Sequence, residues 1–212
     1  MRGKAKGTME VRQALADLAE VRERLATLQR FDGYSGRAAV VSGLVAIGAG
    51  LVQLAVAPHP HDAHSRGLYL TIWLICLGLA LAINYGAILV WRDRHQSLQA
   101  GAQFRTVGMS ILPAIAAGGV ITLGLVMRGL VDLLPPMWCA TYALGLFASR
   151  ALVPPAVVWI AVAFGAVAAL LLLLPSVDPL GWWIMPLAFG GGQIVIGAIV
   201  LAEPDHERTL FR

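Results

Sequence analysis

Charged side chains and cysteines are both scarce in this sequence. Asp, Glu, Lys and Arg make up 13% of the 212 residues, and the chain has 2 cysteines. Cys76 and Cys139 lie in apolar runs without CxxC spacing, so a disulfide scaffold is excluded and we expect buried thiols. The apolar runs hold no histidine, which argues against bis-histidine haem ligation. The shortage of charge also excludes a disordered chain and argues against a proton pump.

Apolar residues, by contrast, make up 58% of the chain and are concentrated in six long runs. The runs are residues 38–57, 68–91, 107–127, 130–149, 152–174 and 180–202. As a helix, each is long enough to cross a hydrocarbon layer of about 30 Å, where a helix satisfies its own backbone. The sequence predicts an all-α polytopic membrane bundle of six transmembrane helices over residues 33–203. A cytoplasmic segment (residues 1–32) precedes it and a cytoplasmic tail (residues 204–212) follows.

Basic residues indicate the orientation of these spans. All but two of the 16, Arg66 and Arg128, fall on one side if the chain crosses six times. The positive-inside rule makes that side the cytoplasm, and it predicts a multi-pass protein of the plasma membrane with both termini cytoplasmic. Because these residues set orientation, the net charge of +4 does not indicate a nucleic-acid partner. No apolar run precedes residue 38, so we expect an uncleaved first span.

The fourth run is irregular at its start. Pro135 and Pro136 interrupt it, so the helix can begin at Pro136 and leave residues 130–134 as an interfacial or re-entrant stretch. Asp132 is the one ionisable residue within the six runs. We expect it to pair with Arg128, four residues earlier, rather than to relay protons.

The segment before the first span has the pattern of an amphipathic helix. Its apolar residues form a narrow seam that repeats every seven residues: Val11, Ala14, Leu18, Val21, Leu25 and Leu28. Acidic and basic residues balance and no aromatic residue occurs before Phe31, which makes a membrane-surface helix the weaker interpretation. Packing on the bundle's own loops and pairing with a partner or a second copy stay open, with Val11, Leu18, Val21, Leu25 and Leu28 as the partner-binding residues.

Two short motifs suggest chemistry of their own. His59, His61 and His64 lie close together in the first external loop, and imidazoles of this kind bind zinc, copper or nickel, although a solvated polar loop is the simpler interpretation. The residues Gly33-Tyr34-Ser35-Gly36 match a short nucleophile motif of intramembrane proteases, but no base lies in a span. We therefore expect Ser35 to cap the first span.

The third and sixth runs resemble each other. Residues 112–124 align without gaps to residues 185–197, so that proline, paired glycines, isoleucine and a final glycine coincide. With three spans in each half, the two segments cross in opposite senses, as in carriers built from an inverted repeat with broken helices. The pattern predicts a solute path lined by Pro113, Gly118, Gly119, Pro186, Gly191, Gly192 and Gln193.

Small and amide side chains within the spans predict helix packing. Small residues at four-residue spacing allow close approach in lipid, and they occur at Gly78, Ala82 and Gly86 and at Ala161, Gly165 and Ala169. Amide side chains at Gln53, Asn84 and Gln193 can hydrogen-bond across such contacts.

One stretch supports a family resemblance. Residues 15–53 contain the seam at Leu18, Val21 and Leu25, then Arg30-Phe31-Asp32-Gly33-Tyr34 and a first span rich in Gly and Ala. This stretch resembles uncharacterised bacterial polytopic membrane proteins that begin with a short cytoplasmic helix. The resemblance implies a bacterial inner-membrane setting and no particular activity.

The function expected from the sequence is that of a non-enzymatic regulatory or scaffolding subunit. Its N-terminal helix would bind a soluble cytoplasmic protein or a second copy, its spans would contact the lipid bilayer, and no cofactor is expected. A small-solute permease with a 3+3 inverted repeat is the alternative. An external metal-handling protein using His59, His61 and His64 is the second alternative.

Overall fold

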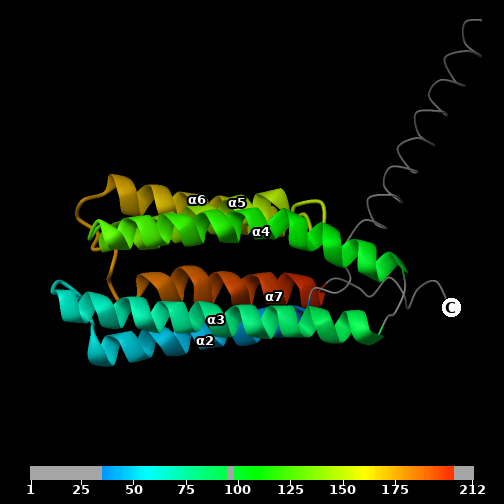
Figure 1. The fold of residues 1–212 in the computed structure, drawn as a ribbon, viewed down its shortest axis with the longest axis horizontal. Coiled ribbons are helices and arrows are strands. Elements are labelled where there is room, and N and C mark those ends of the chain that lie inside the picture. The colour runs from blue at the N-terminus through cyan, green and yellow to red at the C-terminus, as the bar shows by residue number, and fades with distance from the viewer. Residues whose placement is uncertain (1–34, 95–97, 203–212) are drawn as a thin grey trace, which may run out of the picture.

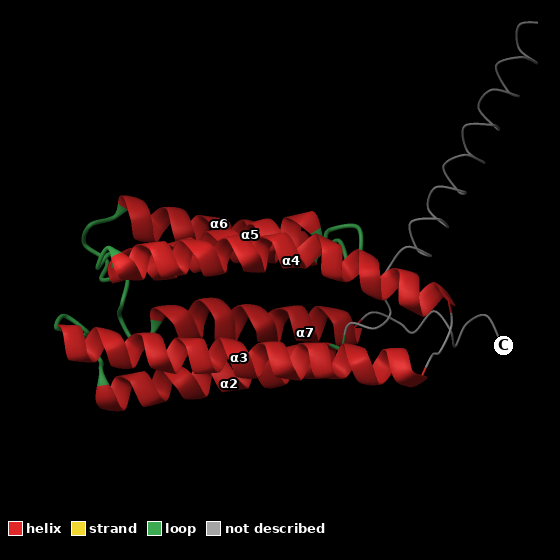
Figure 2. Ribbon diagram, viewed as in Figure 1, coloured by secondary structure: helices red, strands yellow, loops and turns green. Residues whose placement is uncertain are grey.

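The computed structural model describes residues 35–94 and 98–202, of which 82% are helical, with no strand among them. Figures 1 and 2 show long helices that each run antiparallel to the next along the chain. The elements are α2 (Gly36–Val56), α3 (Ala63–Arg94), α4 (Leu98–Met127), η1 (Val131–Leu133), α5 (Leu134–Ala148), α6 (Val157–Leu173), η2 (Pro186–Gly191) and α7 (Gly192–Ala202). The all-helical class is therefore confirmed.

Prolines decide where several helices begin. α5 starts at Leu134 with Pro135 and Pro136 in its first turn, where a missing N–H leaves no hydrogen bond unmade, and the short 3-10 turn η1 precedes it. α6 starts after Pro154 and Pro155, five residues later than the apolar run. The helical part of the sixth run is likewise shorter than the run itself.

The expectation of two broken helices is wrong for the third run. α4 continues through Pro113 without a break. The sixth run does contain an irregularity, because Pro186–Gly191 forms a π-helical turn before α7. A π turn takes up an extra residue and is often found at functional sites.

The helices form two layers. α2, α3 and α7 make one group, and α4, α5 and α6 make the other (Figure 1). α2 packs along α3 and along η2 and α7, while α5 packs along α6 and α4; contacts of α3 with α4 and of α6 with α7 are much sparser. If α2, α3 and α4 are exchanged for α5, α6 and α7 in that order, the same pairs of helices pack together.

Glycines bring α2 unusually close to η2 and to α7. A Cβ added at Gly43 would lie 2.7 Å from the carbonyl oxygen of Gly190, and one at Gly197 would lie 2.6 Å from that of Gly36. Gly50 packs in the same way against the ring of Pro186. The backbones can approach this closely because these positions carry no side chain.

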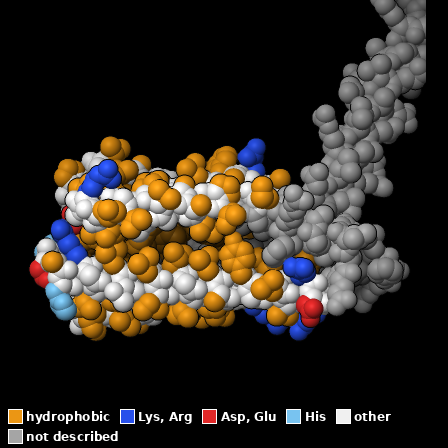
Figure 3. Space-filling view, in the orientation of Figure 1, with side chains coloured by type: hydrophobic (Ala, Val, Ile, Leu, Met, Phe, Trp, Pro, Cys, Tyr) orange, Lys and Arg blue, Asp and Glu red, His pale blue; other side chains and the backbone are white. Residues whose placement is uncertain are grey.

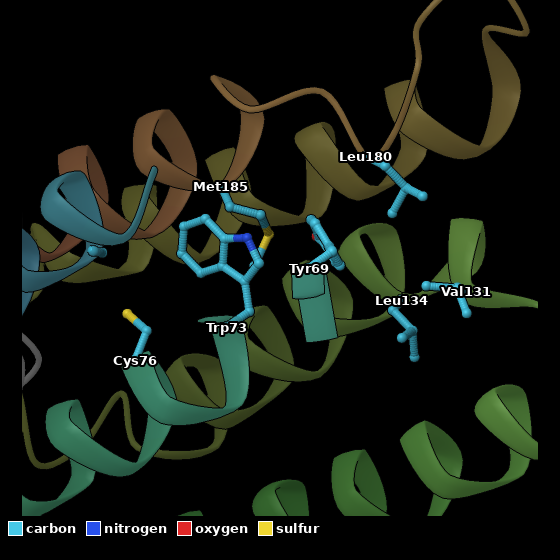
Figure 4. Packing of buried hydrophobic residues seen from close by; sticks show 8 residues of the cluster. Tyr69, Trp73, Cys76, Val131, Leu134, Leu180 and Met185 are labelled. Carbon is cyan, nitrogen blue, oxygen red and sulfur yellow. The ribbon is translucent and has the colours of Figure 1, made fainter. Parts of the chain in front are cut away.

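One apolar cluster joins the two groups near the end where α3 begins. Tyr69, Trp73 and Cys76 of α3 pack with Leu134 of α5 and with Met185, next to η2. Figure 4 shows Tyr69 and Trp73 pointing from α3 toward Met185, with Leu134 beyond Tyr69. Cys76 and Cys139 are buried free thiols, as expected.

The outside of the bundle is apolar. Val120, Trp159 and Leu173 are 74%, 74% and 76% exposed, and large apolar side chains cover every long helix. In Figure 3 they line a hollow between α3 and α4, while charged side chains gather at the two ends. Among the described helices, three are long and apolar enough to cross a membrane: Gly36–Val56, Ala63–Arg94 and Val131–Ala148. Such a surface suits lipid and associates the chain with a membrane.

Candidate functional site

Gln53 of α2 joins α2 to α3 and to the segment before η2, at the end of the α2, α3 and α7 group where α3 begins. The side chain is fully buried, and its Nε2 donates to the carbonyl oxygen of Leu180 at 2.8 Å. Its Oε1 accepts a hydrogen bond from Trp73 Nε1, also at 2.8 Å. Both ends of the amide are satisfied, so this residue serves the structure.

Asn84 and Thr122 make comparable cross-links. Asn84 Nδ2 donates to Ser42 Oγ at 2.6 Å, and Ser42 Oγ in turn donates to the carbonyl oxygen of Ala38. Trp138 Nε1 donates to Thr122 Oγ1 at 2.8 Å, which ties α5 to α4. Each of these bonds lies within one of the two helix groups.

A fourth polar pair bridges the two groups. Gln193, in the first turn of α7, donates from Nε2 to the hydroxyl oxygen of Tyr142 on α5 at 2.6 Å. Tyr142 lies near the middle of α5, and Phe164 lies near the middle of α6. The ring of Tyr142 is 4.7 Å from that of Phe164 and 5.3 Å from that of Phe189, measured between centroids.

The other end of the Gln193 amide is unsatisfied. Its Oε1 is buried and has no hydrogen-bond partner. An amide oxygen buried without a partner costs about 1–3 kcal/mol. Next to it, a Cβ added at Gly192 would lie 2.7 Å from Phe164 Cε2, so the Phe164 ring lies directly against the α7 backbone. We define Gln193, Tyr142, Phe164 and Phe189 as the amide–aromatic site.

Comparisons with protein families, with curated proteins and with solved structures found no match for this chain. Around an apolar trio of rings stand a phenol hydroxyl and a carboxamide, both uncharged at neutral pH. The arrangement can hydrogen-bond an uncharged molecule, and its own four side chains offer no charge to neutralise an ion.

The residues expected to line one solute path do not all gather. Gly118 packs against Thr141 of α5, whereas Gly119 and Gly191 have nothing within contact distance of an added Cβ. Pro113 is exposed, and Pro186 packs on α2. Of the predicted set, only Gln193 belongs to the amide–aromatic site, and Gly192 packs against its Phe164 ring.

The ungapped alignment of residues 112–124 with residues 185–197 does not hold in the structure, because aligned residues do not make matching helix contacts. Gly118 of α4 meets α5, but its aligned partner Gly191 does not meet α2; Gly190 does. The π turn in η2 accounts for this, because one extra residue rotates all following side chains by about 100°. The match between halves is therefore one of helix arrangement, not of residue positions.

Asp132 pairs with a different arginine from the one expected. Arg66 Nη2 lies 3.2 Å from Asp132 Oδ2, which joins α3 to η1 across the two groups. The predicted partner Arg128 instead donates to the carbonyl oxygen of Gly124 on its own helix. The 3-10 turn at residues 131–133 removes the helical spacing on which the expected pair depended. Nearby, the buried hydroxyl of Tyr69 has no hydrogen-bond partner.

The histidine loop does not gather its imidazoles in the described structure. The rings of His59 and His61 stack with centroids 6.3 Å apart, and the backbone N–H of His64 donates to Asp62 Oδ1. Among the described residues, no three His, Cys, Asp or Glu side chains are placed to hold a metal ion together. Asp62 acts as a cap for α3, and hydrogen bonds, chiefly from the Ser65 hydroxyl, lower its carboxyl pKa to about 2.

Other predictions have mixed outcomes. Ser35 Oγ accepts from the backbone N–H of Ala38, which confirms the expected cap. All three span amides hydrogen-bond across helices, as expected. Gly78, Gly86 and Gly165 meet nothing within contact distance, so the expected close packing is absent at these three glycines. The seam at Val11, Leu18, Val21, Leu25 and Leu28 lies outside the described residues.

Sequence reasoning missed the partners of the amides. Tyr142 was not singled out, although a tyrosine in the middle of an apolar run needs a hydrogen-bond partner there. Trp73 carried the same signal, since its indole N–H lies within the second apolar run. Arg66 carried none, because its partner lies 66 residues away.

Proposed function

We propose that this protein is an integral membrane carrier that moves a small uncharged solute through the interface between its two helix groups. The packing pattern supports this proposal. Each group combines two helices from one half of the chain with the third helix from the other half. Inverted-repeat carriers bind solute near the middle of the bilayer at such an interface.

The interface has the properties that movement requires. Within each group the helices pack along their lengths, whereas between groups the contacts of α3 with α4 and of α6 with α7 are sparse. The Arg66–Asp132 pair and the Tyr69 cluster lie near one end of the interface. Both side chains of the ion pair are partly exposed, so its rupture costs at most about 1 kcal/mol.

The proposal includes six crossings with both termini in the cytoplasm. Arg37, Arg92, Arg94 and Arg150 lie at helix ends that the positive-inside rule assigns to the cytoplasm. A membrane-impermeant maleimide applied to intact bacterial cells should label a cysteine that replaces His61 but not one that replaces Arg150. Labelling of both or neither from outside would contradict this topology.

Spin-label distances test movement without knowledge of the solute. One pair of labels replaces exposed Gly67 and Met127 at the ends of α3 and α4, and another replaces Arg37 and Arg150 at the opposite ends of the groups. Both pairs are placed in a background whose native cysteines are alanine. In lipid, each pair should show a short and a long distance population. The movement that shortens the distance in one pair should lengthen it in the other. A single unchanging population for both pairs would refute the carrier.

A second proposal concerns the seam before the first span. Its seven-residue spacing from Val11 to Leu28 suits docking of a soluble protein or a second copy. Removing residues 1–30 should then change the oligomeric state or the set of co-purifying proteins. An unchanged mass and an unchanged set of proteins would dismiss docking, with no bearing on the carrier.

A further inference from the structure

We infer that the amide–aromatic site is where the solute binds, and that its ligand is a small uncharged molecule with an N–H or O–H donor and an apolar part. This inference rests on the proposed carrier function. The acceptor for the donor is Gln193 Oε1, the buried oxygen without a partner.

The position of the site supports this assignment. Gln193 belongs to the group of α2, α3 and α7, whereas Tyr142 and Phe164 belong to the other group. The 2.6 Å hydrogen bond between Gln193 and Tyr142 therefore breaks when the groups separate. Tyr142 and Phe164 lie near the middle of their helices, and Gln193 lies near the middle of the continuous helical segment Pro186–Ala202 that η2 and α7 form. Separation therefore exposes a carboxamide and a phenol at mid-depth of the bilayer.

The chemistry of the site defines the class of ligand. A carboxamide oxygen accepts a hydrogen bond, and the rings of Tyr142, Phe164 and Phe189 offer apolar faces. An ion would have to lose its water without an opposite charge from these side chains, which is costly in hydrocarbon. Acetamide has a suitable shape, since its amide N–H groups face Gln193 while its methyl group faces the rings.

The described conformation is the closed one. The Phe164 ring lies against Gly192, where an added Cβ would be 2.7 Å from Cε2, and it is 5.0 Å from the Phe189 ring between centroids. A solute reaches Gln193 when the Phe164 ring moves away from α7. Gly192 makes this closure possible, since any side chain there would hold the ring away.

The test measures solute entry into vesicles that contain the full-length protein. Stopped-flow light scattering follows acetamide, glycerol and choline in vesicles with and without protein. Wild type should speed the entry of acetamide or glycerol but not that of choline. Gln193→Leu should slow this entry about 2- to 10-fold, the effect of one neutral hydrogen bond. Asn84→Leu is the matched control, because it removes an amide that is bonded within one group.

Each outcome decides the inference. Equal slowing by Gln193→Leu and Asn84→Leu, or none by either, would overturn the assignment to Gln193. Faster entry of choline alone would also overturn it, because the rings would then bind a cation. The spin-label distances test the carrier separately. If both label pairs show two distance populations but neither acetamide nor glycerol enters faster, this ligand class is rejected and the carrier proposal stands. Retention of folded protein in each variant is checked by its elution as a single species in detergent.

Discussion

The close approach of α2 to η2 gives the most quantitative prediction. Gly43 and Gly48 lie on the same helix, but a Cβ added at Gly43 would be 2.7 Å from the Gly190 carbonyl oxygen, whereas one added at Gly48 meets nothing within 4 Å. Alanine is a better helix former than glycine by about 1 kcal/mol, and this gain is common to both positions. The difference between Gly43→Ala and Gly48→Ala therefore isolates the cost of pushing two backbones apart.

That cost can be estimated from the contact. The Gly190 oxygen belongs to backbone and cannot rotate away, so the helices must separate, and overpacking of this kind costs about 1–3 kcal/mol. We expect Gly48→Ala to leave the free energy of unfolding unchanged or slightly raised. Gly43→Ala should lie about 1–3 kcal/mol below it.

The assay is reversible unfolding of the purified protein in lipid–detergent micelles by added SDS, followed by tryptophan fluorescence. Free energies are compared at the same SDS fraction, since both variants share the same unfolded state. If the two variants agree within about 0.5 kcal/mol, the close packing of α2 on η2 is refuted, and the arrangement of α2, α3 and α7 with it.

Three further predictions follow from other contacts. Gln53→Leu keeps the volume but leaves two buried partners unpaired, so the free energy of unfolding in the same SDS assay should fall by about 2–6 kcal/mol, and a fall under 1 kcal/mol would contradict the bonds. Arg66→Met should lower it by less than about 1 kcal/mol, because the Asp132 pair is partly exposed; a larger loss would mean that this pair is a main support of the interface. Ser65→Ala should raise the carboxyl pKa of Asp62 from about 2 toward 3.8, measured by carbon NMR of the carboxyl group, so the cap of α3 would weaken at a higher pH on acidification. An unchanged pKa would show that the Ser65 hydroxyl does not hold this carboxylate.

Much of the fold could be predicted because hydrophobicity along the chain is a local property. Each long described helix overlaps an apolar run, although α3 and α4 extend beyond theirs. Ser35 marks the start of α2 by its bond to a neighbouring N–H, and prolines in the first turn of α5 and before α6 mark the starts of those helices. The amides of the spans could be expected to find partners, because lipid offers none. Gln193 was expected to hydrogen-bond on this ground, whereas its place with Gly192 on a solute path was predicted from the resemblance of the third and sixth runs.

What the sequence determined by itself is the helical class, the positions of the apolar segments and the shortage of charge within them. The tertiary structure decided which helices pack together, that Asp132 faces Arg66 rather than Arg128, and that Gly190 meets α2 in place of Gly191. These outcomes depend on the rotation of each helix about its axis, and a single π turn changes that rotation by about 100° for every residue after it. Gln193 meets Tyr142 because of that rotation, and no local pattern in the sequence encodes it.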